Sequence, residues 1–259
     1  MGFEHIRLEQ GPDAVATLTI ARPERLNALS SQTVDELRAA VESLEGSGAR
    51  CLLITGEGRG FSSGADLAGG GGLPRDAGEA LEKHFNPLVE TLFALPIPVV
   101  AAVNGPCAGA GCSLALSADI VIAARSAYFL QAFVNIGLIP DAGATWLLPR
   151  LAGRARAMEM MLLGERIPAE RALEWGLIAR VVDDETLASE AAALAARLAA
   201  GPTVAYGLIR RLAREAGQLP LSDALAAERR AQGEAGRTED FPRAVAAFLQ
   251  KQQPRFEGR

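Results

Sequence analysis

Few side chains of this chain are suited to acid, base or metal chemistry. The only histidines, His5 and His84, are far apart in the sequence, which offers little for a metal centre or a histidine relay. We expect both at the surface. The three cysteines, Cys51, Cys107 and Cys112, are an odd number without C-x-x-C spacing. They predict reduced, buried thiols rather than a disulfide framework or a zinc site, and no metal site is expected.

One carboxylate, Asp141, stands in a setting that allows two interpretations. It follows Pro140 and precedes a helical pattern, and an aspartate there commonly caps the helix by accepting from backbone N–H groups. The residue pattern alone favours this cap. If Phe133, Trp146 and Leu147 instead enclose the carboxyl, they would favour its neutral form and make it a stronger base. These three side chains fit ordinary core packing equally well.

Two segments rich in small residues follow buried strands, FSSGADL at 61–67 and NGPCAGAGCS at 104–113. A helix that starts near Gly109 would direct unpaired N–H groups and its positive dipole end at a ligand. Two such N–H groups converging on one carbonyl oxygen would form an oxyanion hole. Each segment alone is weak support, because Gly-Ala turns usually serve close packing.

Short β-branched runs alternate with helical patterns in the N-terminal half, which indicates an α/β core. Strands are expected at 14–20, 51–55, 99–103, 119–124, 127–129 and 178–182. Helices are expected near 31–46, 79–94, 109–118, 143–151, 153–163, 168–175, 185–200, 202–216, 220–235 and 239–251. We therefore predict an α/β core over 1–200 and a C-terminal helical region over 201–259.

Composition narrows the class of protein. The 259 residues are 49% hydrophobic and 22% charged, as in a globular protein with a sizeable core. The net charge of −5, from 31 acidic and 26 basic residues, gives no general attraction for nucleic acid or anionic membranes. No signal-peptide pattern and no apolar run near the ~20 residues of a membrane span is found, so a cytoplasmic location is expected. The four glycines at 69–72 predict a mobile surface loop.

Taken together, the segments 61–67 and 104–113 resemble the two signature loops of the crotonase (enoyl-CoA hydratase/isomerase) superfamily. RPERLNAL at 22–29, GLIPDAG at 137–143 and AERALEWGLIARVV at 169–182 are also similar to that family. The resemblance covers nearly the whole chain. It implies a spiral of repeated β-β-α units, a C-terminal helical trimerisation region, and a homotrimer or a hexamer built as a dimer of trimers. The implied substrate is a coenzyme A thioester, with no separate cofactor.

The resemblance also implies roles for particular residues. The N–H groups of Ala65 and Ala110 occupy the positions that bind the thioester oxygen. Four further residues fall where the family lines its coenzyme A pocket: Arg25, Leu26, Asp66 and Leu67.

The sequence departs from the family's hydratases at their two catalytic glutamates. Ser113 and Phe133 stand at those positions, and we count both among the substrate-binding residues. The segment 132–159 resembles the phenylacetate-pathway isomerase branch, which converts ring-epoxidised phenylacetyl-CoA to its oxepin. In that branch an aspartate at position 141 is the single acid/base. The resemblance thus favours an isomerase in which Asp141 moves the proton.

Three alternatives stay open. A hydratase-like lyase would use Ser113 and Asp141. A non-catalytic member of the fold would bind coenzyme A or act as a scaffold. A nucleotide-dependent oxidoreductase would use Gly109-Ala110-Gly111 after strand 99–103, but Leu114 replaces the third glycine of that fingerprint and no acidic residue is placed to bind a ribose.

Overall fold

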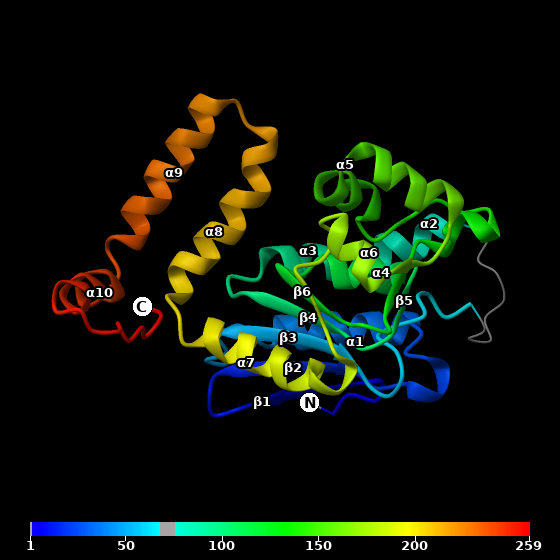
Figure 1. Cartoon of the computed structure of the whole chain (residues 1–259), viewed down its shortest axis with the longest axis horizontal. Coiled ribbons are helices and arrows are strands. Elements are labelled where there is room, and N and C mark those ends of the chain that lie inside the picture. Colours follow the sequence, from blue (N-terminus) through cyan, green and yellow to red (C-terminus); the bar gives the residue numbers. More distant parts are fainter. Residues whose placement is uncertain (1, 68–75) are drawn as a thin grey trace.

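The computed structural model describes residues 2–67 and 76–259. Its main sheet has six strands in the order β1-β2-β3-β4-β6-β9, visible near the centre of Figure 1. The β1–β2 pair is antiparallel and the remaining pairs are parallel. The strands are β1 Ile6–Gln10, β2 Val15–Ile20, β3 Cys51–Gly56, β4 Val99–Val103, β6 Ile120–Ala124 and β9 Arg180–Val182.

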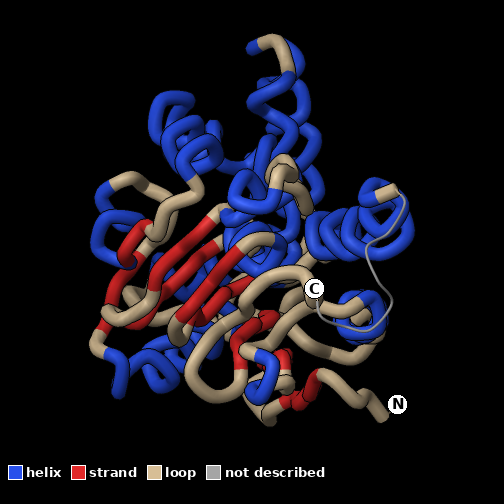
Figure 2. The backbone as a smooth tube through the Cα atoms, turned by 90° about the vertical axis from the view of Figure 1, so that its right-hand side faces the viewer, coloured by secondary structure: helices blue, strands red, loops and turns tan. Residues whose placement is uncertain are grey.

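The sequence explains why the central strands are parallel and covered. All five residues of β4 are buried, as are five of the six in β3, which fits strands with both faces packed. Helices flank these strands in Figure 2. Helix α7 (Leu187–Ala199) packs on β2, β3, β4 and β6, while α1 (Ser31–Glu42) packs on β1, β2 and α3 (Asn86–Ala94).

A second sheet has three strands in the order β5-β7-β8. Its members are β5 Pro106–Ala108, β7 Tyr128–Leu130 and β8 Ile167–Pro168. Strand β4 leads through β5 into helix α4 (Ala110–Leu116), and β6 leads through β7 into α5 (Ala144–Leu163). These are two successive β-β-α turns of a spiral, as the fold prediction requires.

The last third of the described chain is mainly helical. After α6 (Ala169–Glu174) and α7 come α8 (Thr203–Glu215), α9 (Leu221–Ala235) and α10 (Asp240–Leu249). Helices α8 and α9 project away from the sheet in Figure 1; we call α8–α10 the arm. The division of the chain near residue 200 into a core and a helical region stays a prediction.

Ion pairs fix the first helix of the arm to the core. Asp119, at the start of β6, accepts from the Val99 N–H at 2.7 Å and from Arg210 Nε at 2.5 Å. Arg214 donates to its other oxygen at 3.0 Å. The Arg210 guanidinium is nearly fully buried and also donates to the Leu95 carbonyl. Sequence analysis gave these residues no role.

Two further contacts fold the C-terminal tail back onto the protein. Arg50 donates to Thr203 Oγ1 at 2.8 Å and to the Phe256 carbonyl at 3.0 Å. The buried Asp240 carboxylate accepts from the Glu257 and Gly258 N–H groups at 2.7 and 2.8 Å. The tail is therefore held by Arg50 of the core and by Asp240, the first residue of α10.

Most predicted elements are confirmed. These include the two helices expected at 143–151 and 153–163, which are the two stretches of α5 and are separated by a kink at Gly153, where φ is 76° and ψ is 160°. There are two kinds of correction. Strands β1, β5 and β8 were missed. The single helix expected at 79–94 contains a π-helical segment, Leu81–Phe85.

The loop predicted at 69–72 lies outside the described residues. Among those described, no single helix is long and apolar enough to cross a membrane, although one bent pair, Asp184–Ala199 with Thr203–Gln218, reaches that length and hydropathy together.

Candidate active site

The two small-residue loops meet in space through their backbones. Ser62 forms an isolated parallel bridge with Cys107, and the Ala108 N–H donates to the Ser62 carbonyl at 2.9 Å. A Cβ on Gly64, where φ is 94°, would lie 2.9 Å from the Ala108 carbonyl oxygen. A Cβ on Gly111 would lie 2.5 Å from Ser62 Cβ. The contact therefore needs glycine at both positions.

Two asparagine amides, from the buried Asn27 and the half-buried Asn104, hold the turn that precedes the first loop. Asn27 Nδ2 donates to the Glu57 and Gly60 carbonyls at 2.9 and 2.7 Å. Asn104 Nδ2 donates to two other carbonyls of the same turn at 2.9 and 2.8 Å. Sequence analysis missed both roles. Asn104 directly follows a buried strand, and Asn27 lies inside the 22–29 motif, which were the available signals.

The two predicted oxyanion donors are free of internal partners in the part of the chain described. Neither the Ala65 N–H nor the Ala110 N–H donates to a described residue, whereas the adjacent Asp66 and Gly109 N–H groups donate to the Leu29 and Leu130 carbonyls at 3.0 and 2.8 Å. Ala110 is the first residue of α4, where an N–H has no partner within the helix. Both N–H groups are thus unengaged within the described residues.

Asp141 lies at the turn before α5, but its side chain does not cap that helix. The N-cap residue is Gly143, and no side chain provides a capping hydrogen bond. The cap interpretation of Asp141 was therefore wrong. Its Oδ1 is buried and has no hydrogen-bond partner among the residues described. Burial raises the pKa of this carboxyl from 3.8 to about 6, the direction expected for a desolvated acid.

Two of the apolar side chains named for the surroundings of Asp141 lie near the second loop and the turn before α5. Phe133 is buried, and its ring lies 3.7 Å from the position that a Cβ on Gly109 would take. Leu147 and Val89, a residue of α3, both lie 3.7 Å from the corresponding position on Gly143, two residues after Asp141. Val89 was not predicted.

Trp146 has partners of its own. Its ring packs edge-on against Phe93, with ring centroids 5.8 Å apart, and the Arg150 guanidinium lies 4.0 Å from its centroid. Its main contacts are therefore with α3 and with its own helix.

The residues predicted for coenzyme A belong to the first loop and to the 22–29 segment, which contacts that loop through the Ser63 N–H and the Leu26 carbonyl. Asp66 forms an ion pair of 2.9 Å with Arg22, and its side chain is 5% exposed, so it braces the loop. Leu67 is 63% exposed, Arg25 is exposed and Leu26 is half-buried in a left-handed conformation with φ of 51°. Their coenzyme A contacts stay predictions.

The histidine and cysteine predictions have mixed outcomes. The three cysteines are free and buried, as predicted. Both histidines are half-buried rather than fully at the surface: His5 Nδ1 lies 2.9 Å from Thr33 Oγ1, and His84 Nδ1 lies 2.8 Å from Asp35 Oδ1. Over residues 2–67 and 76–259, no group of three His, Cys, Asp or Glu is placed to hold a metal ion.

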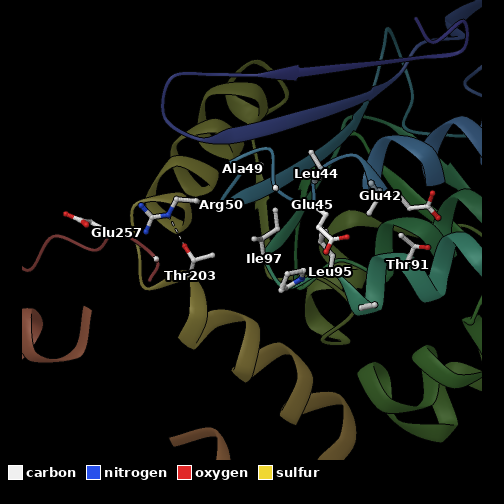
Figure 3. A pocket seen from close by; sticks show the side chains of 16 residues that line it. Glu42, Leu44, Glu45, Ala49, Arg50, Thr91, Leu95, Ile97, Thr203 and Glu257 are labelled. Carbon is white, nitrogen blue, oxygen red and sulfur yellow. Dashed lines mark hydrogen bonds between the residues drawn. The ribbon is translucent and has the colours of Figure 1, made fainter. Parts of the chain in front are cut away.

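A cavity of about 690 Å³ lies elsewhere, between the core and the start of the arm. Figure 3 shows its lining, which includes Glu42, Arg50, Leu95, Thr203 and Glu257. None of the predicted site residues lines it. The two loops and Asp141 are therefore a candidate site separate from this cavity.

The chain is similar to known proteins over nearly its whole length. Residues 10–259 match the family described as "Enoyl-CoA hydratase/isomerase". The chain belongs to that family. It is 50% identical to the 1,2-epoxyphenylacetyl-CoA isomerase of Escherichia coli (strain K12) over the whole of both chains. It is 45% identical, again over both full lengths, to a Rhodobacter capsulatus protein named "Probable enoyl-CoA hydratase".

Solved structures agree with this family assignment. The crystal structure of enoyl-CoA hydratase from Bacillus anthracis superposes with a TM-score of 0.94 at 31% identity, covering 99% of this chain and all of that one. The crotonase-like fold and the resemblance to the phenylacetate isomerase branch are confirmed. The oxidoreductase alternative was wrong, because the chain belongs to an enoyl-CoA hydratase/isomerase family. In this fold the Gly-Ala-Gly run leads into α4, which begins at the second residue of the run.

Proposed function

We propose that this family member is an acyl-CoA isomerase in which Asp141 moves a proton and the Ala65 and Ala110 N–H groups hold the thioester oxygen. The observation that carries the proposal is the Asp141 carboxyl, which has a buried, unpartnered Oδ1 and a pKa raised to about 6 by burial. A carboxyl with a pKa near the working pH can both accept and return a proton.

The proposed reaction needs only these groups. Ionised Asp141 removes a proton from the acyl chain, and the electron pair moves onto the thioester oxygen to give an enolate. The Ala65 and Ala110 N–H groups donate to that oxygen, and donors of this kind are commonly worth about 3 kcal/mol each in the transition state. The protonated carboxyl then returns the proton to another carbon. One acid/base suffices for this 1,3-shift, and no separate cofactor is required.

Two substrates fit this chemistry. One is a 3-enoyl-CoA, converted to the 2-enoyl isomer. The other is ring-epoxidised phenylacetyl-CoA, converted to its oxepin. The 50% identity to an enzyme named 1,2-epoxyphenylacetyl-CoA isomerase supports the second.

A hydratase-like lyase is the alternative supported by the names of other relatives. It would need a second group to activate water. Ser113 is fully buried and Phe133 is apolar, so neither supplies a base, and we favour the isomerase. A non-catalytic role in binding coenzyme A would leave the raised pKa of Asp141 without a use.

We also propose that the protein assembles as a homotrimer or as a dimer of trimers through the arm. Large apolar side chains of α9 and α10 are exposed in the single chain: Leu221 at 74%, Leu225 at 53%, Phe241 at 55%, Phe248 at 79% and Leu249 at 76%. Exposed apolar surface of this kind marks association sites. The cytoplasmic location also stays a prediction.

The test is to incubate the protein and its Asp141→Asn variant with a 3-enoyl-CoA and a 2-enoyl-CoA in deuterated water. Products are followed by mass spectrometry and NMR. Glu190→Gln, at an exposed position in the first turn of α7, is the matched control. Double-bond migration without water addition, lost only in Asp141→Asn, is the expected result.

Other outcomes point elsewhere. Water addition that survives Asp141→Asn would refute the isomerase assignment and return the case to a hydratase. If neither enoyl-CoA turns over, the ring epoxide is tested next, and failure there would favour the binding role.

A further inference from the structure

Ser113 occupies a place in the site that its chemistry as a base does not explain. Its side chain is fully buried in α4, three residues after the predicted oxyanion donor Ala110. Its hydroxyl lies 2.9 Å from the backbone carbonyl oxygen of Asp141 and 3.4 Å from that of Gly109. A hydroxyl carries a single proton, so the shorter contact takes it. The bond to Asp141 thus replaces the contact to the carbonyl four residues back that helical serines usually make.

The backbone that Ser113 grips is held in an uncommon conformation. The Asp141 carbonyl also accepts from the Ala144 N–H at 3.0 Å. The two residues after Asp141, Ala142 and Gly143, are both left-handed, with φ of 49° and 86°. Alanine adopts this conformation at a cost of about 1–2 kcal/mol. The peptide that follows Asp141 is therefore fixed by two hydrogen bonds against a local preference for another geometry.

The Asp141 side chain has no such support of its own. Its Oδ1 lacks a hydrogen-bond partner among the described residues, and no capping bond holds the carboxyl to α5. The position of the carboxyl therefore depends on its backbone, and Ser113 is the side chain that holds this backbone.

We propose that Ser113 is a positioning residue: its hydroxyl links the helix that begins with the oxyanion donor to the peptide that carries the acid/base. This inference rests on the proposed function. It adds that the distance between the enolate-binding N–H of Ala110 and the carboxyl of Asp141 is set by one buried hydrogen bond. Ser113 neither touches the reacting atoms nor holds a water in this role.

The test compares Ser113 variants that separate the hydrogen bond from packing. Ser113→Ala removes the hydroxyl. Ser113→Cys keeps a side chain of similar size with a much weaker donor, and Ser113→Thr keeps the hydroxyl. Ser117→Ala is the matched control, because Ser117 is buried one turn later in the same segment and its hydroxyl donates to the Ser113 carbonyl at 2.9 Å.

Steady-state kinetics on the substrate that wild type turns over, across pH 5 to 9, give the readout. We expect Ser113→Ala and Ser113→Cys to lower kcat by about 10- to 100-fold, the scale of a misplaced catalytic group, with KM changed less than about threefold. Ser113→Thr should retain most of kcat, and Ser117→Ala should behave as wild type. The acid limb of the pH profile should stay in place, since burial rather than Ser113 sets it.

The failures of the two proposals are distinguishable. If Asp141→Asn is inactive while Ser113→Ala and Ser113→Cys match Ser117→Ala, Ser113 has no positioning role and the proposed function stands. If Ser113→Cys has a normal kcat while Ser113→Ala has a low kcat, the loss of kcat comes from a cavity and not from the missing hydrogen bond. That result would overturn the inference. If Asp141→Asn retains activity, the proposed function fails and this inference fails with it.

Discussion

The buried carboxyl of Asp141 should make the protein less stable at neutral and alkaline pH than its uncharged variant. Folding raises the pKa of this group from 3.8 to about 6 because burial disfavours the charged form. Between those two values the folded state binds more protons than the unfolded state, so stability falls as the pH rises. Above the pKa of the folded state, the full free-energy cost of burying the ionised carboxyl is present. Asp141→Asn, which is neutral at every pH, removes it.

The magnitude follows from the two pKa values. The difference between 3.8 and about 6 corresponds to roughly 3 kcal/mol as an upper limit. The side chain retains some contact with solvent, which reduces this figure to about 1–2 kcal/mol. For a chain of this size that is about 2–6 °C in Tm.

Thermal unfolding of both proteins, from pH 4 to pH 8, measures this difference. The Tm of Asp141→Asn should match that of wild type near pH 4, rise above it through pH 6 and stay above it beyond pH 7. The variant should also lose turnover. Glu190→Gln, at an exposed position in α7, should show no such gain. A variant that is no more stable than wild type at pH 8, or a difference that does not change with pH, would refute the burial argument.

Three further outcomes are expected. Ala110→Pro removes one oxyanion donor at the first position of a helix, where proline is tolerated. Steady-state kinetics should show that kcat falls by about 100-fold, and calorimetry should show only a small change in Tm. Asp119→Ala leaves the buried Arg210 without its carboxylate partner, and urea unfolding should show a loss of about 2–4 kcal/mol. Gly64→Ala places a Cβ 2.9 Å from the Ala108 carbonyl oxygen at a left-handed position. Activity and about 2 kcal/mol of stability should therefore be lost. Normal kinetics in this variant would contradict the contact between the two loops.

Sequence patterns located every strand of the main sheet except β1, because continuous apolar runs such as Val99–Val103 require two covered faces. They missed β5, since Pro106–Ala108 is three residues long and lies inside a motif interpreted as a loop. They correctly divided α5 near Gly153, where the backbone leaves the helical conformation. Short strand pairings depend on tertiary contacts that periodicity does not encode.

The candidate site was predictable in part. Asp141 could be singled out by type and resemblance, but its pattern favoured a helix cap, and only the structure shows its Oδ1 without a partner. The bond from Ser113 to the Asp141 carbonyl joins residues 28 positions apart. No spacing rule predicts such a contact, because it depends on how α4 packs against the turn before α5.

The unengaged N–H groups of residues 65 and 110 have a consequence for how this site can be studied genetically. Both positions are already alanine, and the groups proposed to contact the enolate belong to the main chain. A scan that replaces side chains one at a time with alanine would therefore leave both donors untouched and report Asp141 as the only reactive group. The position of the loops depends instead on side chains that are not proposed to contact the ligand, such as Asn27 and Asn104, and on the absence of a side chain at Gly64. Variation at those positions is where inherited changes in activity should be sought.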